Sequence, residues 1–269
     1  MSTAIAMQET GAFSGKDNTT VRQRNISRTD SSQEDVAWLT SPHDVDSSNL
    51  PLDTNTFTPT SVFWITPHGM LTKEITILDL TKDMTVPYAG LTDAYKAAVK
   101  TTLKDHSFTP ILNCHRQNWI GLKYHITDSH SNTIAYWNHG WLSASEAILS
   151  FPTNSPHSSH PISLKNKTWG LRTESFTLDS QLFFWEMDSK WHSYNMTLYK
   201  VFGTGDSQKK VEVAKYSQKW WGSCSTGGAL VVDTKDGQGI DGVVACLTLV
   251  IVLKKKRQRA AERYGNGAY

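Results

Sequence analysis

The sequence predicts a mainly β domain in which a closed antiparallel β-barrel surrounds a buried C-terminal hydrophobic α-helix. Three observations lead to this prediction. From Phe57 onward, short apolar or alternating stretches are separated by turn residues, which is typical of an antiparallel β domain. Residues 242–253 then form a run of twelve without a charge. Six bases follow at once in residues 254–263, against one acid, Glu262.

The first 55 residues differ from the rest in composition and hydrophobic pattern. They are rich in Ser, Thr, Asp, Asn and Gln and show no hydrophobic periodicity. Such a segment cannot bury enough apolar surface to offset the entropy of ordering. We therefore expect a disordered polar leader over residues 1–55, a single barrel domain over residues 56–264 and a flexible tail over residues 265–269.

Composition and cysteine usage indicate the compartment. A chain of 269 residues with 38% hydrophobic positions can bury one good-sized core. The first 20 residues lack the basic and apolar regions of a signal peptide. Three cysteines, Cys114, Cys224 and Cys246, cannot all pair, which favours reduced thiols. The expected location is the cytoplasm, with the inner membrane surface and the nucleus as alternatives.

The predicted strands are short runs of β-branched and aromatic residues bounded by turn residues. They cover residues 61–65, 73–78, 119–126, 133–137, 181–186, 194–201, 210–216 and 228–233. Hairpin turns are expected at residues 128–132, where Asp, Ser and Asn bond their own backbone, and at residues 202–207, where two glycines permit positive φ.

Three further segments depart from the strand pattern. Residues 91–104 carry Ala and Lys at helical spacing and predict a surface helix, and residues 144–149 predict one short helical turn. Residues 151–161 hold three prolines and several serines, which is typical of an irregular loop.

The apolar run is ambiguous by local propensity, because Val, Ile and Thr dominate it and suit a buried strand. Three features favour a helix over about residues 241–263. Asp241 is a good N-cap, no turn signal interrupts the segment, and the bases after it suit the negative end of a helix dipole. The strand remains the alternative.

A helix that is apolar on all sides must be enclosed on all sides. Twelve residues are fewer than the roughly 20 that a bilayer span requires, so no transmembrane span is expected. Burying about eight large side chains contributes on the order of 12 to 24 kcal/mol before entropic costs, enough to override poor helix propensity. Since the rest of the domain is nearly all strand, a closed barrel is the natural enclosure.

Several stretches carry a resemblance to a known family. Residues 175–185 (SFTLDSQLFFW) are similar to an "F-x-L-x-G-x-x-Y-x-W" strand pair, with Ser180 where glycine is common. Residues 211–216 and 228–232 and the position of Asp241 also fit. The order of features resembles the tubby C-terminal-like superfamily, which includes tubby proteins, phospholipid scramblases and LURP-one-related proteins, and is most similar to its fungal members of unassigned role. The resemblance implies a barrel of about twelve strands threaded by a C-terminal apolar helix.

Two sets of bases are candidates for binding anionic phospholipid. The first is the start of the basic tail, and the second lies in or beside a late strand; tubby-type barrels bind phosphoinositide headgroups through bases on the barrel, which is what the resemblance implies here. The candidates are Lys254, Lys255, Lys256 and Arg257 in the first set, and Lys209, Lys210, Lys215 and Lys219 in the second. A solvated helix end and a nuclear-localisation or nucleic-acid patch are the alternatives for the tail.

The ten tryptophans are many for this length. Several, including Trp185, Trp191 and the pair Trp220 and Trp221, lie within or beside predicted strands. Most are expected to pack in the core or at the barrel rim, and a rim tryptophan also suits a lipid interface.

No catalytic or metal signature is present. His157 and His160, with Cys114 and His115, lack the paired spacing of a zinc site. Cys114 and His115 cannot act as a nucleophile and base, because neighbouring side chains on a strand point to opposite faces. Phosphate loops, nucleophile elbows, kinase signatures and EF-hand loops are absent from the sequence. We expect no cofactor and no metal.

These observations favour a non-enzymatic β-barrel that binds or tethers, with anionic phospholipid or an unknown protein as partner and nucleic acid disfavoured. The alternative is a membrane-associated, scramblase-like protein whose apolar run acts on lipid directly.

Overall fold

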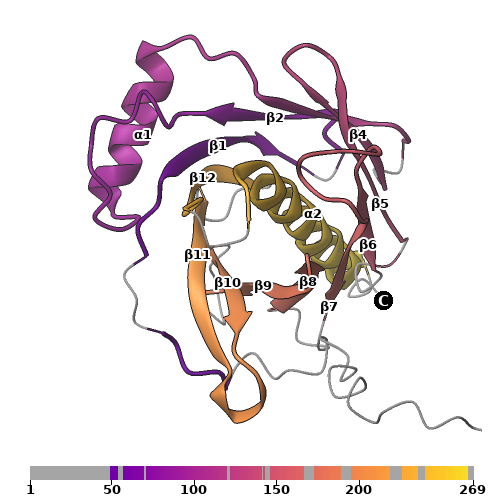
Figure 1. Ribbon diagram of the computed structural model, residues 1–269. Helices are drawn as coiled ribbons and strands as arrows, with labels where there is room; N and C mark the ends of the chain where they lie inside the picture. Colours follow the sequence, from indigo (N-terminus) through magenta and orange to yellow (C-terminus); the bar gives the residue numbers. More distant parts are fainter. Residues whose placement is uncertain are drawn as a thin grey trace, which may run out of the picture. The chain divides into compact units, whose positions relative to one another are not determined.

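The strands close into a barrel in the computed structural model, which describes residues 49–53, 57–69, 71–119, 122–140, 142, 146–166, 173–188, 195–218, 226–235 and 240–265 (Figure 1). Each strand pairs with its neighbours in sequence, and β1 pairs antiparallel with β12, so that Ser61 lies opposite Val232 and the sheet has no free edge. The strands are β1 (Ser61–His68), β2 (Glu74–Asp79), β3 (Leu112–Arg116), β4 (Lys123–Asp128), β5 (Thr133–His139), β6 (Ala147–Ser150), β7 (Ile162–Asn166), β8 (Thr173–Leu178), β9 (Gln181–Met187), β10 (Met196–Phe202), β11 (Lys209–Gln218) and β12 (Thr226–Val232). The predicted fold class is confirmed.

Both predicted hairpin turns are present. Between β4 and β5, the Asp128 carboxylate accepts hydrogen bonds from the backbone amides of His130 (2.9 Å) and Asn132 (2.8 Å). Between β10 and β11, Gly203 and Gly205 have φ values of 84° and 54°, which side-chain-bearing residues rarely adopt. Residues within each turn therefore determine where the chain reverses direction.

The sequence pattern missed some strands and misplaced others. Strands β3, β6 and β7 were not predicted, because each turns only two apolar side chains inward; in β6 these are Ala147 and Leu149. The helical turn predicted over residues 144–149 is wrong, since β6 begins at Ala147. The strand predicted from Trp119 begins only at Lys123, which leaves Trp119 in the β3–β4 connection.

Helix α1 (Asp93–Asp105) lies outside the barrel and confirms the predicted surface helix (Figure 1). Thr92 caps it, since its hydroxyl accepts a hydrogen bond from the Tyr95 amide at 3.2 Å. Tyr95 and Val99 face the sheet and pack in a second apolar cluster with β1 and β12. One face of α1 thus covers the outer side of the strands at which the barrel closes.

Helix α2 (Gly242–Gly265) runs through the barrel interior (Figure 1). Every side chain from Val244 to Leu253 is fully buried, and the strand alternative for this run is wrong. Asp241 starts the helix as predicted, because its carboxylate accepts the Val244 amide at 2.7 Å. Its other oxygen lies 2.7 Å from Nδ1 of His157, which ties the 151–161 loop to the helix start.

Two residues fix how α2 sits in the barrel. A Cβ atom at Gly242 would collide with the Phe63 ring, so glycine is required where the helix enters. Thr248, the one polar residue in the run, donates to the Val244 carbonyl (2.8 Å) and accepts from the Trp185 indole (3.1 Å). The hydroxyl and the indole thereby satisfy each other inside the core.

The end of the predicted leader is bonded to the barrel. The Asp53 amide donates to the Lys210 carbonyl at 2.9 Å, and the Lys210 amide donates to the Pro51 carbonyl at 3.0 Å. Residues 51–53 therefore lie along β11, which differs from the disorder expected there. Residues 1–48, 54 and 55 of the predicted leader, and the tail beyond Gly265, lie outside the described residues.

The enclosed helix makes Leu249→Asp a decisive substitution. We expect the variant to lose cooperative thermal unfolding, because a lone buried carboxylate costs several kcal/mol against a typical stability of about 5 to 15 kcal/mol. Circular dichroism melting is the measurement. The control is Val86→Asp, an exposed position, and a melting curve of Leu249→Asp equal to that of the control would contradict the position of α2.

Candidate functional site at the distal end of the barrel

The two ends of the barrel differ in chemistry. Because all strands are antiparallel, alternate connections lie at the same end. We call the end where α2 begins the proximal end, and the end toward which it runs the distal end. The distal connections are residues 69–73, 117–122, 140–146, 167–172, 188–195 and 219–225. The C-terminal half of α2 brings the basic tail to the distal end.

The first bases of the tail are enclosed by the barrel. Lys254, Lys255 and Lys256 are 3%, 2% and 9% exposed, so the prediction that they face lipid is corrected. Their positions continue the buried helix for one more turn before α2 reaches the surface. Arg257 is partly exposed.

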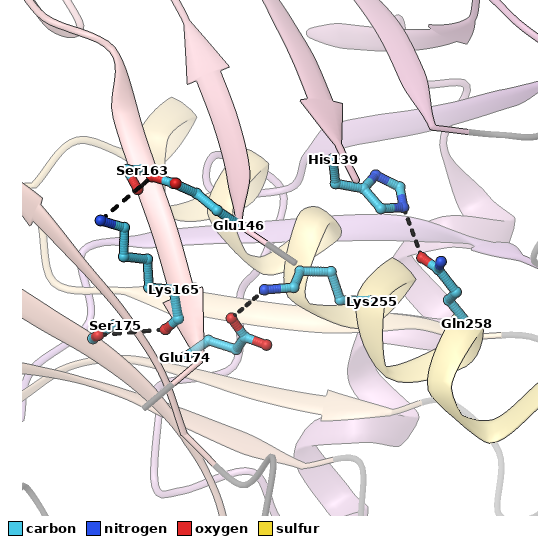
Figure 2. Close-up of polar contacts among 8 residues, drawn as sticks. All are labelled: His139, Glu146, Ser163, Lys165, Glu174, Ser175, Lys255 and Gln258. Atoms are coloured by element: carbon cyan, nitrogen blue, oxygen red, sulfur yellow. Dashed lines mark hydrogen bonds and ion pairs between the residues drawn. The ribbon is translucent and has the colours of Figure 1, made fainter. Parts of the chain in front are cut away.

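Lys255 forms a buried ion pair with Glu174 of β8 (Figure 2). The Nζ to Oε2 distance is 2.6 Å, and both side chains are almost fully buried. Burial raises the pKa of Glu174, while the positive charge of Lys255 opposes that rise. The pair fixes the rotation of α2 relative to β8, because neither charge has another described partner of opposite sign within bonding distance.

Lys254 is held differently. Its ammonium donates to the Gly69 carbonyl at 2.7 Å and lies 5.2 Å from the centre of the Tyr124 ring. Burial, with a smaller effect of Arg116, lowers the pKa of Lys254 to about 8. A carbonyl oxygen and an aromatic face both stabilise a cation.

A chain of neutral polar groups completes the distal interior. The Trp137 indole donates to Nδ1 of His139 at 3.1 Å, and Nε2 of His139 lies 2.9 Å from Oε1 of Gln258 (Figure 2). Since an indole only donates, Nδ1 must accept and Nε2 must carry the proton. Burial lowers the pKa of His139 to about 4, with Lys255 and Lys254 acting in the same direction.

His68 is neutral for a similar reason. Its Nδ1 lies 2.8 Å from the Thr66 carbonyl, which can only accept, so its Nε2 accepts from the Thr226 hydroxyl at 3.1 Å. Burial lowers the pKa of His68 to about 4, and Lys254 and Arg257 contribute to the lowering. Both histidines are structural groups whose rings stay neutral near pH 7.

Two members of the second candidate set, Lys210 and Lys215, lie beside acids on the surface of β11 and its neighbouring strands. Lys210 pairs with Glu186 at 3.3 Å and lies over the Tyr199 ring, and Lys215 pairs with Glu212 at 2.8 Å. Lys209 is exposed. Lys219 lies outside the described residues. The mixed charge of this face disfavours it as a platform for anionic headgroups.

The groups that the sequence raised as metal ligands or as a nucleophile do not form such a site in the described part of the chain. They contain no group of three or more His, Cys, Asp or Glu side chains that could hold a metal ion. Cys114 faces the interior, and burial raises the pKa of its thiol to about 12. His115 points to the other face, where its Nε2 lies 3.4 Å from the Thr127 hydroxyl. A cavity of about 40 Å³ between α1 and the barrel, lined by Trp64, Val99 and Ser217 among others, has room for only a small group.

Sequence reasoning missed the partners of the basic tail. Glu174 and His139 are far from the tail in sequence, and only the strand register brings them to α2. One signal was available: Glu174 alternates in phase with the apolar residues Phe176 and Leu178, which predicts that it points inward with them. An acid there requires a buried base, and Lys255 meets that need.

Comparison with protein-family models, curated proteins and solved structures yields no match for this chain.

The buried pair predicts an asymmetric response to substitution. Lys255→Met is expected to lower the free energy of unfolding by about 3 to 5 kcal/mol, because it leaves Glu174 buried and unpaired. Lys165→Met is the matched control, since it breaks the exposed Lys165–Glu146 pair and is expected to cost less than about 1 kcal/mol (Figure 2). Urea unfolding measures both, and equal losses would show that the buried pair has no special role.

The two histidines predict a loss of stability in mild acid. Their folded pKa values of about 4 lie below the ordinary value of 6.5, so the unfolded chain takes up protons first. Their contribution is complete above pH 6.5 and is lost as the pH falls toward 4, at up to about 1.4 kcal/mol per pH unit for each histidine.

His139→Gln tests this assignment, because glutamine accepts from Trp137 and donates to Gln258 without titrating. Between pH 7 and pH 5, the free energy of unfolding of the variant should fall about 2 kcal/mol less than that of wild type. Urea unfolding at the two pH values gives the difference. Identical pH slopes would mean that His139 already accepts a proton in the folded barrel.

Proposed function

We propose that this chain is a non-enzymatic binding module that recognises anionic phospholipid surfaces through the distal end of its barrel. Membership of the tubby C-terminal-like superfamily is part of the proposal, because a closed barrel with a central C-terminal helix is what that resemblance implies. The inner membrane surface is the corresponding location.

One observation carries the proposal: in the sequence, the connections on the two sides of the strand order carry net charges of opposite sign. The distal connections hold five basic and two acidic residues in the sequence. The connections at the proximal end, with the segment that leads into α2, hold five basic and eight acidic residues. An anionic surface attracts the distal end and repels the proximal end.

Described side chains place part of this charge at the surface. Lys73 follows β1, and Lys123 begins β4; both are exposed. Arg116 ends β3 between them and is partly exposed. Glu74 is the exposed acid beside Lys73. The bases outnumber the acid at this part of the rim, so it is suited to phosphate and carboxylate headgroups.

The barrel interior is filled, so a ligand has to bind to the outer surface. Helix α2 fills the barrel, and its apolar side chains contact strands rather than solvent. Among the described residues, no helix is both long and apolar enough to cross a bilayer. The scramblase-like alternative needs the apolar run in contact with lipid, and no described feature favours that contact.

The proposal predicts charge-dependent vesicle binding. Wild-type protein should float with phosphatidylcholine vesicles that contain phosphatidylserine, and much less with phosphatidylcholine alone. Lys73→Glu/Lys123→Glu should weaken that binding roughly thirtyfold, at about 1 kcal/mol for each base lost near the surface. Lys104→Glu, an exposed position on α1, is the matched control.

Two outcomes would contradict the proposal. Wild-type protein that floats with neither vesicle has no affinity for anionic bilayers. An equal loss on Lys104→Glu would show that binding follows net charge rather than the distal end.

A further inference from the structure

Tryptophan is unevenly distributed in the sequence between the two sets of strand connections. In the sequence, the distal connections after β3, β5, β7, β9 and β11 each contain tryptophan, and the proximal connections contain none. Trp119 is the one of these that lies among the described residues. Turns and loops normally favour small polar residues, so this distribution calls for an explanation other than turn formation.

Large apolar side chains are also exposed at the distal end. Trp119, Leu142 and Leu71 are 80%, 62% and 59% exposed, and they are the three most exposed large hydrophobic residues of the described part of the chain. They lie in the β3–β4, β5–β6 and β1–β2 connections. Because β1 to β6 are successive neighbours in the sheet, these connections follow one another along the rim.

Hydrogen bonds join two of the connections to the ends of neighbouring strands. The Arg116 guanidinium donates to the Leu71 carbonyl at 2.7 Å, which ties the β1–β2 connection to the end of β3. The His139 amide donates to the Leu122 carbonyl at 3.0 Å, which ties the β3–β4 connection to the end of β5. The exposed side chains are therefore carried on linked parts of the rim.

The β3–β4 connection also has an internal brace. The Asn118 side-chain oxygen accepts from the amides of Leu122 and Lys123, at 2.9 and 3.2 Å. Both bonds close the turn directly beside Trp119. Asn118 is thereby bonded to residues 122 and 123 across the turn, while the Trp119 side chain faces solvent.

We propose that Leu71, Trp119 and Leu142 insert into the interfacial layer of an anionic bilayer, an inference that rests on the proposed function and specifies how the distal end binds. Tryptophan prefers the boundary between headgroups and acyl chains, where its indole has both apolar and polar neighbours. Leucine side chains gain by leaving water for the same layer. Lys73, Arg116 and Lys123 flank these residues and match the charge of anionic headgroups.

This arrangement assigns separate roles to charge and to apolar surface. The bases attract the distal end to the membrane, and that attraction weakens as salt screens it. The apolar side chains then retain the barrel at the surface, and salt weakens that contribution little. Binding should therefore fall with salt to a residual level rather than to zero.

The test compares apolar substitutions at the two ends of the barrel. The distal variant is Trp119→Ala/Leu142→Ser, and the matched proximal control is Val86→Ser/Phe202→Ser, which also replaces exposed apolar residues. Flotation with phosphatidylcholine/phosphatidylserine vesicles is measured at low, physiological and high salt. The distal variant should bind about tenfold more weakly at physiological salt and lose the residual binding at high salt. The control should stay within about twofold of wild type.

The outcomes separate this inference from the proposed function. If wild type binds and the distal variant binds equally at all three salt concentrations, insertion is overturned while binding through charge stands. If wild type binds no vesicle, the proposed function and the inference both fail. If wild type binds no vesicle but self-associates in sedimentation velocity, and the distal variant does not, the surface is an interface between copies of the chain. Unchanged melting curves of both variants establish that each is folded.

Discussion

The enclosure of an apolar helix by a closed sheet is the constraint on which the rest of the structure depends. Ten successive side chains of α2 are fully buried, and no single face of a sheet can hide all sides of a helix. The sheet must close around it, which explains why β1 pairs with β12. The same helix fills the space in which a barrel of this kind would otherwise hold a ligand.

Because the helix is apolar on all sides, hydrophobic burial alone does not fix its rotation or depth. Polar contacts supply that information along its length: the Asp241 cap at the start, Thr248 with Trp185 in the middle, and Lys255 with Glu174 near the far end. The Asp241 carboxylate binds the helix backbone, whereas Thr248 and Lys255 bind side chains of two different strands. A buried polar group tolerates few positions, so these contacts select one arrangement from many of similar apolar burial.

The sequence predicted the architecture because its strongest signals were long and physically unambiguous. An uncharged run of twelve residues with an N-cap at Asp241 predicted the central helix, and that helix implied the closed sheet. Short strands such as β3 and β7 escaped prediction, because two inward apolar residues are too few to reveal a period of two. Here the closed hydrogen-bond ladder determines the conformation more than local preference does.

The candidate site was only partly predictable, because charge in a sequence does not reveal burial. Lys254, Lys255 and Lys256 read as a solvated basic cluster, yet the barrel encloses all three. Lys255 finds its partner on β8 and Lys254 finds one in the β1–β2 connection, and only the strand register brings these near. Conversely, Trp119 was predicted to begin a strand, but it lies in an exposed connection. Outer and inner positions follow from where each strand starts, which is the least certain feature of any sequence-based prediction.

The order of elements along the chain has a consequence for how the protein is made. A ribosome releases β1 to β12 before α2, so the strands leave the ribosome without the helix that fills their interior. The partner of β1 is also the last strand to appear, which makes closure depend on contacts that are distant in sequence. Until α2 is present, the inward-facing aromatic and aliphatic side chains are exposed to solvent, where they can bind chaperones or aggregate. Closure of this barrel therefore depends on the helix that follows all of its strands in sequence.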